Sequence, residues 1–541
     1  MAIVAAACVP YLPTVGDYFT QDDFGVVQLL VRRPWTTFPR WFVMPWMEDI
    51  WGYTPDELRP FVAFTYQLTG KWAPGRPELH HLFNVAMHVG NSLLVMAIAR
   101  RVILLSPAGA AVAGFVFAVL PGQAESVAWI TGRVDSMPAF FYLATFLAYA
   151  LWRQHRGWRM YAAGLALFFV ALFSKQNTIT MLVTLAAYDW IVLTSRERGA
   201  LLSAPKYWAP FALLTGGYLL LRRALFGHSL RPGLQTQDHI AAVATMIEHH
   251  VRRTVIGHLG PLSYVEAAAA AFLLTALVLI AIRSEPESRS RFLRAVGFFG
   301  VLWFVIGVAP VALAGYESPR HAYLASAGWA FMLAVIADGL YVRLRSTGIR
   351  RAAVAAVAAM LVVYLVRLVP VVQGWRSSAR ISAAAVMRVQ QEAAAAAPGT
   401  LMIVGVPRTS WEWSSPFMLG PPFAPAGLVD RVRFVTPWRL HCCGREHWNV
   451  YTRLRIQGWT EAAPRPPIVA VRFAPETGAV SRLTDAEYPE LQTIVPVLLQ
   501  TANADSLDRV ISDVLDRIVA GRPDGPRMET GDRTTPVRPP R

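Results

Sequence analysis

Charged residues and cysteines are both scarce in this chain. Asp, Glu, Lys and Arg make up 16% of its 541 residues, against about a quarter in a soluble globular protein. There are three cysteines, Cys8, Cys442 and Cys443. Neighbouring cysteines such as 442 and 443 rarely pair with each other, and no metal-ligand spacing is present. The cysteines therefore carry no functional signal.

Apolar residues take the place of the missing charge. They amount to 54% of the chain, and the mean hydropathy is +0.37. They come in long blocks, several near the ~20 residues that span a bilayer as a helix. The blocks lie at 108–120, 137–152, 161–173, 179–193, 211–221, 267–282, 295–314, 322–341 and 352–372. A helix bundle in lipid follows, because backbone polar groups there must be paired internally.

The net charge of +16 follows a pattern along the chain. Basic residues fall in alternate connections between the apolar blocks, at 100–101, 153–159, 196–206, 283–294 and 343–351. This is the positive-inside pattern of a membrane protein, so nucleic-acid binding is a poor explanation of the charge. Taking the basic connections as cytoplasmic gives about eleven spans, with the chain leaving the membrane on the outer face.

The last third of the chain differs in kind. An Ala-rich helix is predicted at 376–397, buried strands at 401–407 and 468–473, and a helix at 499–519. The Pro/Arg-rich end is typical of disorder. We expect a polytopic α-helical membrane domain over 1–375, a small extracytoplasmic α/β domain over 376–520, and a disordered tail over 521–541.

An acidic pair, Asp22 and Asp23, follows the first apolar segment. Carboxylates that close to a bilayer are costly, and neighbouring like charges repel. An enzyme working at the membrane surface could use the pair as a base or as ligands of a cation. The alternative is a solvated loop with a helix N-cap.

Three cations break the topology rule, because short outer loops should be poor in them. Arg133, Lys175 and Arg320 each lie in a short outer connection. One interpretation is snorkelling to lipid headgroups. The other is a clamp for a lipid-linked phosphate, since guanidinium and ammonium groups bind phosphate well. Three such loops on one face favour the clamp.

Acidic and histidine residues nearby have two interpretations each. Glu125 and Asp135 flank Arg133; Glu125 is either a catalytic carboxylate or, as we favour, the salt partner of Arg133. His80, Asn84 and His88 share one helical face, with His81 next to them. They could bind a metal, but hydrogen bonding between helices is the commoner use of such residues in a bundle.

Five segments together resemble a known family. They are FTQDD at 19–23, RPF at 59–61 with HHLFNVAMH at 80–88, ESVAWITGRVD at 125–135, SKQ at 174–176, and ESPRHAYLASAG at 317–328. In this order they resemble the signatures of the C-type (GT-C) polytopic membrane glycosyltransferases. The likeness is strongest to bacterial relatives of the transmembrane O-mannosyltransferases that carry tetratricopeptide repeats. Two positions depart from the family pattern, Gln123 for His and Gln176 for Glu.

The resemblance implies transfer of a sugar, mannose or a similar hexose or pentose, from a polyprenyl-phosphate donor at the outer face of the cytoplasmic membrane. Asp22 is the expected base, with Asp23 orienting it or binding the acceptor. The expected phosphate-binding residues are Arg133, Lys175 and Arg320. Supporting or substrate-binding roles are expected for Arg59, His80, His81, Asn84, Glu125, Asp135, His321 and Tyr323. Some members of the superfamily use a divalent cation, and Asp22 and Asp23 would be its ligands here.

The sequence leaves other classes open. A polymerase or ligase acting on lipid-linked glycans would not need the Asp22 base. A transporter of polyprenyl lipids usually shows paired, broken spans in two halves, which this chain lacks. In a non-catalytic scaffold protein, the carboxylates of these loops would have no catalytic role. The acceptor could be a glycan, a lipid or a protein.

Overall fold

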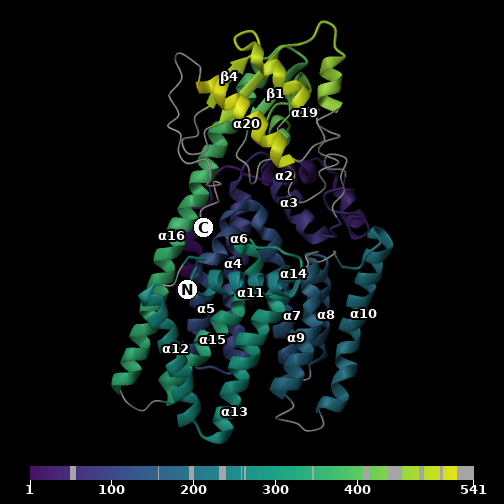
Figure 1. The fold of residues 1–541 in the computed structure, drawn as a ribbon. Coiled ribbons are helices and arrows are strands. Elements are labelled where there is room, and N and C mark those ends of the chain that lie inside the picture. The colour runs from purple at the N-terminus through teal and green to yellow at the C-terminus, as the bar shows by residue number, and fades with distance from the viewer. Residues whose placement is uncertain are drawn as a thin grey trace.

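The computed structural model describes residues 1–48, 56–155, 157–193, 200–230, 239–257, 259–260, 263–343, 347–405, 415–435, 454–473, 480–499 and 504–520. It has a bundle of long helices with a small mixed α/β layer at one end (Figure 1). One long helix, α16 (Thr347–Ala395), runs from the bundle to the sheet.

The bundle is built from helices of very unequal length. They are α1 (Ala2–Cys8), α4 (Glu78–Ile98), α5 (Pro107–Val119), α6 (Ala124–Ala128), α7 (Arg133–His155), α8 (Trp158–Leu172), α9 (Met181–Tyr188), α10 (Ala200–Phe226), α12 (Tyr264–Arg283), α13 (Pro286–Ala295), α14 (Trp303–Leu313) and α15 (Ser326–Arg343). A continuous apolar core joins them, and it includes the fully buried Phe117, Phe146 and Phe331.

Four helical stretches are long and apolar enough to cross a membrane. They are Glu78–Ile103, Ile130–His155, Pro286–Leu313 and Arg350–Ala395. A fifth counts if α5 and the Pro121–Ala128 stretch, bent by 53° at their junction, form one span. These stretches agree with a polytopic membrane protein. The expected number of about eleven spans stays a prediction, since several other apolar helices are shorter than a full span.

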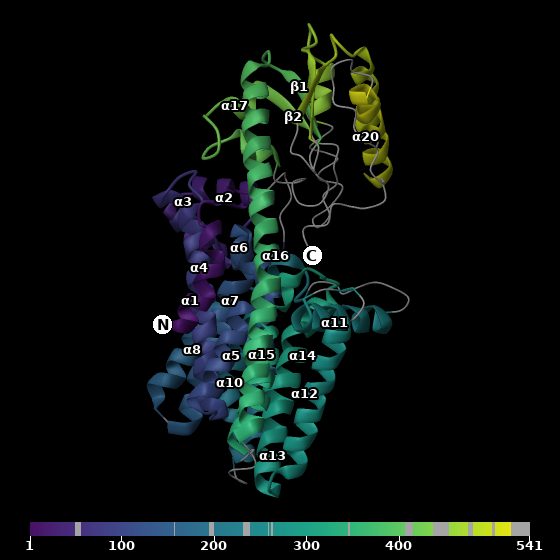
Figure 2. The same cartoon turned by 90° about the vertical axis from the view of Figure 1, so that its left-hand side faces the viewer.

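The sheet end of the bundle carries helices that do not run along its axis. The first long loop forms α2 (Asp23–Arg32), a 3₁₀ helix (Trp35–Phe42) and α3 (Pro60–Trp72). A second long connection forms α11 (His239–Val255), which lies across the bundle (Figure 2). These segments form the layer between the bundle and the sheet.

The sheet has the strand order β2-β1-β3-β4. Its strands are β1 (Thr400–Gly405), β2 (Val432–Val435), β3 (Ile468–Phe473) and β4 (Val480–Thr484). β1 is parallel to β2 and β3, and β4 is antiparallel to β3. The helices α17 (Leu428–Arg431), α19 (Ile494–Leu498) and α20 (Ala504–Ala520) accompany the sheet.

The sequence predictions for this region are confirmed as elements. β1 and β3 are the two strands expected from 401–407 and 468–473, although residues 406–407 lie outside the described residues. The helix expected over 499–519 is α20, which begins after Asn503. The tail over 521–541 also lies outside the described residues. Apolar side chains of β1, β3 and α20 share one core that includes Ile403 and Leu515.

α16 is continuous through residue 375, where we expected a domain boundary. The helix predicted over 376–397 is its second half. Trp375 is buried and its ring stacks on Trp129, with centroids 5.8 Å apart. The division into 1–375 and 376–520 stays a prediction, and α16 belongs to both parts.

Candidate functional site

The acidic pair lies in a tight turn that opens α2. Gln21 has a positive φ of 56°, and Asp22 is the N-cap of the helix. Asp23 is 1% exposed. One carboxylate oxygen of Asp23 accepts the backbone N–H of Thr20 at 3.0 Å, and the other accepts the N–H and the hydroxyl of Thr131 at 3.0 and 2.6 Å. The Asp23 carboxylate therefore fixes the conformation of the turn. The side chain of Asp22, by contrast, is only partly buried.

Burial raises the pKa of Asp23 to about 7, and the donors from Thr131 and Thr20 act in the opposite direction. The neighbouring charge of Asp22 adds to the rise. Asp23 thus titrates near neutral pH, in a place where it can influence Asp22.

Arg320 is the central cation of the site. Its Nη1 donates to Glu125 at 3.2 Å, its backbone N–H donates to the same carboxylate at 3.3 Å, and its Nε lies 3.5 Å from Asp135. The guanidinium carbon lies 4.7 Å from the centroid of the Trp129 ring. Burial lowers the pKa of Arg320, but the charges of Glu125, Asp135 and Asp22 raise it overall. Asp22 therefore lies within electrostatic reach of this cation.

Lys175 joins the same cluster through Asp135, which accepts a hydrogen bond from its ammonium group. Burial lowers the pKa of Lys175, and the neighbouring Asp135 opposes that shift. His321 Nδ1 lies 3.8 Å from Asp135, and burial together with Lys175 and Arg320 holds its pKa well below the usual range. His321 is thus neutral near pH 7.

Arg59 completes the charged cluster. Its Nη2 pairs with Glu57 at 2.9 Å, and its guanidinium lies 5.3 Å from the Trp46 ring. Its positive charge contributes to lowering the pKa of both Lys175 and His321. We define the cation cluster as Arg59, Lys175 and Arg320, each with most of its side chain buried or half-buried.

Arg133 lies apart from the cation cluster that we expected it to join. It is 0% exposed. Its guanidinium donates to Asn84 Oδ1 at 3.2 Å, to the Thr65 hydroxyl at 3.2 Å and to the His80 carbonyl at 3.0 Å. It lies between the rings of Tyr66 and Phe83, 4.2 and 4.5 Å from their centroids. Glu125, which we expected to pair with Arg133, pairs with Arg320 instead.

The polar face of α4 connects helices. His80 Nδ1 lies 2.8 Å from the Thr69 hydroxyl, and Asn84 donates to the Trp129 carbonyl at 2.8 Å. His88 contacts the Tyr323 hydroxyl at 2.8 Å. His81 Nε2 lies 3.1 Å from the Asp17 carbonyl. This is the interhelical hydrogen bonding that we favoured. No group of three or more His, Cys, Asp or Glu suited to a metal ion occurs in the part of the chain that the structure describes.

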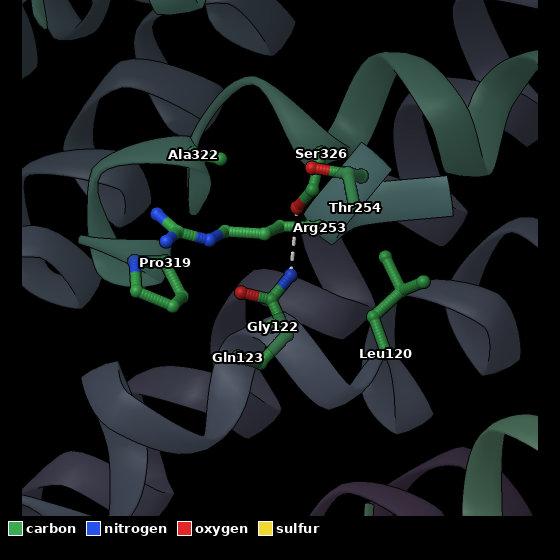
Figure 3. Close-up of a pocket in the computed structure, with 8 residues that line it drawn as sticks. All are labelled: Leu120, Gly122, Gln123, Arg253, Thr254, Pro319, Ala322 and Ser326. Atoms are coloured by element: carbon green, nitrogen blue, oxygen red, sulfur yellow. Dashed lines mark hydrogen bonds between the residues drawn. The ribbon is translucent and has the colours of Figure 1, made fainter. Parts of the chain in front are cut away.

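A small hollow lies next to the Arg320 loop, under α11 (Figure 3). Its lining residues are Leu120, Gly122, Gln123, Arg253, Thr254, Pro319, Ala322 and Ser326. Gln123 Nε2 donates to the Ser326 hydroxyl at 2.7 Å. Gln123, the position that departs from the family pattern, therefore ties the 121–123 turn to the start of α15.

Sequence reasoning missed Thr131 and Trp129. Both lie inside the segment at 125–135, so the motif marked the region but not these contacts. Arg253 of the hollow lies in the basic end of α11 and had no signal in the sequence.

No family model matches the chain, but comparisons with known proteins find relatives in sequence and in fold. It is 30% identical over 204 residues to the protein O-mannosyl-transferase Tmtc1 of Drosophila melanogaster, covering 36% of this chain and 23% of that protein. It is 25% identical over 184 residues to human protein O-mannosyl-transferase TMTC3, covering 32% of this chain and 18% of that protein. The chain thus spans less than a quarter of the length of these relatives.

A solved structure extends the likeness over most of the fold. ArnT from Cupriavidus metallidurans, bound to undecaprenyl phosphate, matches 88% of this chain and 93% of its own with a TM-score of 0.51, at 14% identity. At that identity the match concerns the fold alone. The fold of the chain is thus similar to that of ArnT. In sequence the chain resembles the transmembrane O-mannosyltransferases, as its motifs indicated.

Proposed function

We propose that the chain is a membrane glycosyltransferase that moves a sugar, mannose or a similar hexose or pentose, from a polyprenyl-phosphate donor to an acceptor at the outer face. The single observation that carries this proposal is that Trp129 links the Asp22 turn to the cation cluster: its Nε1 donates to the Thr20 carbonyl at 3.4 Å, and its ring lies 4.7 Å from the guanidinium carbon of Arg320. A base and a phosphate-binding surface are then neighbours, as transfer from a phosphate leaving group requires.

Asp22 is the proposed general base. It is partly exposed, whereas Asp23 is buried beneath it and already holds three donors. A carboxylate at the surface of a fixed turn can accept the proton of an acceptor hydroxyl while the phosphate leaves. Asp23 orients it.

Lys175, Arg320 and Arg59 are the proposed phosphate-binding residues. Arg320 has further N–H groups beyond the Nη1 that donates to Glu125, and the buried Arg59 Nε has no hydrogen-bond partner among the described residues. Charge-assisted hydrogen bonds to a leaving phosphate stabilise developing negative charge without a proton donor. Glu125 and Asp135 keep these cations in place before the donor binds.

The proposed orientation places the site outside. The α13 helix, with Arg289, Arg291 and Arg294, lies at the end of the bundle opposite the sheet (Figure 1). Basic connections favour the cytoplasmic side. The site loops and the sheet share the other end, which we therefore assign to the periplasm or cell exterior.

Purified full-length protein in lipid nanodiscs tests the function. We would incubate it with a panel of polyprenyl-phosphate sugars, mannose first, and follow release of polyprenyl phosphate and the fate of the sugar by mass spectrometry. We expect sugar-dependent release by the wild type and none by Asp22→Asn. Equal release by both would point to a polymerase or ligase that lacks this base. Movement of intact donor across the bilayer without release would point to a transporter.

The acceptor needs a separate experiment. Envelope glycans, lipids and glycoproteins from cells with and without the protein would be compared by mass spectrometry. A sugar missing from one class identifies the acceptor as a glycan, a lipid or a protein.

A further inference from the structure

The turn that carries Asp22 and Asp23 packs against a segment almost 400 residues away in the sequence. Phe19 and Phe24 flank the pair Asp22–Asp23 on both sides, and both side chains are fully buried. The Phe423 ring contacts both of them edge-on, with centroids 4.9 Å from Phe19 and 5.0 Å from Phe24. The ring of Phe423 thus packs on both residues that flank the acidic pair.

The segment at 415–424, which carries Phe423, is itself fixed to α16. Gln390 Nε2 donates to the carbonyl of Met418 at 2.8 Å and to the carbonyl of Phe423 at 3.0 Å. Ser382 of the same helix donates to the Phe19 carbonyl. α16 therefore holds both the turn and the segment that covers it.

The segment also packs tightly on the first outer loop. Gln28 of α2 donates to the Phe417 carbonyl at 2.9 Å. A Cβ at Gly420 would lie 2.3 Å from the Gln28 amide nitrogen, and a Cβ at Gly75, where φ is +71°, would lie 2.8 Å from the Pro422 carbonyl oxygen. The positive φ and the backbone contact require glycine at 75, whereas a side chain at 420 would displace the Gln28 amide from its hydrogen bond to Phe417.

We propose that Phe423 is a positioning residue for the acidic pair, through which the C-terminal part of the chain sets the geometry of the site. The ring fixes Phe19 and Phe24, and these fix the turn that presents Asp22. The inference rests on the proposed function where it concerns catalysis. Its structural content, the ordering of residues 19–24 by Phe423, stands independently of that function.

Three variants of the full-length chain in nanodiscs test the proposal. Phe423→Ala removes the ring, and Phe423→Leu keeps apolar volume at the same place. Phe292→Ala removes the same kind of side chain from α13, where Phe292 is buried in the separate apolar core of the helix bundle. Each variant is compared with the wild type by hydrogen–deuterium exchange of residues 17–26 and by kcat and KM for the polyprenyl-phosphate donor.

We expect Phe423→Ala to speed exchange in the turn and to lower kcat by on the order of 10–100-fold, as expected for a small misplacement of a reacting group. KM for the donor should change less than about threefold, because the Phe423 ring packs on Phe19 and Phe24 and so acts on the turn. Phe423→Leu should recover part of both losses, and Phe292→Ala should show neither.

Unchanged exchange and unchanged kcat in Phe423→Ala would overturn the inference while leaving the proposed function intact. A wild type that transfers no sugar would overturn the proposed function, and the exchange data would still decide whether Phe423 orders the turn. If Phe423→Ala does not fold, Phe423→Leu and Gln390→Ala decide it. Exchange in the turn must then rise in Gln390→Ala, which releases the segment from α16, and wild-type exchange there would overturn the proposal.

Discussion

Arg320 donates to Glu125 at 3.2 Å, although the two residues are 195 positions apart in the sequence. The pair brings the short loop before α15 against α6. The guanidinium carbon of Arg320 also lies 4.7 Å from the centroid of the Trp129 ring. A cation held by a carboxylate and a ring is pre-oriented, so it loses little side-chain entropy when it also contacts a phosphate.

The first prediction concerns the base. Asp22→Asn keeps the size and polarity of the side chain but removes its ability to accept a proton. We expect kcat to fall at least ~100-fold, the low end for a positioned general base. Asp23→Asn should reduce kcat less, unless a cation bridges the pair, in which case both variants fail together. A purified Asp22→Asn protein with near wild-type turnover would transfer the role to Glu125 or Asp135.

The second prediction concerns the phosphate-binding residues. Lys175→Ala and Arg320→Ala should each weaken use of the donor by on the order of 1.5–3 kcal/mol, a typical contribution of a charge-assisted hydrogen bond. This corresponds to roughly 10- to 150-fold in kcat/KM. Arg76→Ala is the matched control, because Arg76 is a solvent-exposed cation of the first outer loop, paired only with Glu78 among the described ion pairs. Normal donor kinetics in both test variants would contradict the phosphate-binding role.

The third prediction separates Arg133 from that cluster. Its guanidinium is buried and donates to Asn84, Thr65 and the His80 carbonyl. Arg133→Ala leaves Asn84 Oδ1 buried without this donor and also removes the guanidinium's contacts with two rings; an unsatisfied buried group costs about 1–3 kcal/mol. We expect a marked fall in the thermal unfolding midpoint in detergent. Arg133→Lys should not restore it, because an ammonium group cannot stack between two rings. A well-folded Arg133→Ala protein that binds donor poorly would instead support the original clamp.

The fourth prediction concerns pH. Thr131→Val removes the hydroxyl that donates to Asp23 at 2.6 Å and helps to lower its pKa. The pKa of Asp23 should therefore rise further above about 7, and less of the carboxylate is ionised at neutral pH. If ionised Asp23 orients Asp22, the acid limb of the kcat profile moves to higher pH. Thr145→Val is the control, since its hydroxyl donates to the Phe141 carbonyl within α7. An unshifted acid limb would exclude Asp23 from the titration that controls the rate.

The fifth prediction concerns topology. Reporter fusions after residues 156 and 347 should be cytoplasmic, because both positions lie within basic connections, 153–159 and 343–351. A fusion after residue 398 should be external. A cytoplasmic sheet would place the acidic pair and the cation cluster on the side away from the proposed acceptors.

Local features of the sequence determined the broad class of the fold and some of its elements. The apolar blocks and alternating basic connections indicate a polytopic membrane protein by themselves. A helix in lipid needs a continuous run of apolar residues, and basic residues in the connections set its orientation, and both features are local in the sequence. Short apolar runs ended by Pro and Gly marked β1 and β3. The five motifs marked the segments that meet at the site.

The tertiary structure alone decided which of these residues meet. In the sequence, Arg133, Lys175 and Arg320 are equivalent: each is a cation in a short outer loop. In the structure Lys175 and Arg320 both pair with Asp135. Arg133 instead lies between the rings of Tyr66 and Phe83. The partner of a buried charge depends on how distant helices pack, and no local periodicity encodes that packing. The contact of Phe423 with Phe19 was invisible in the sequence for the same reason, since it needs α16 to run unbroken from the bundle to the sheet.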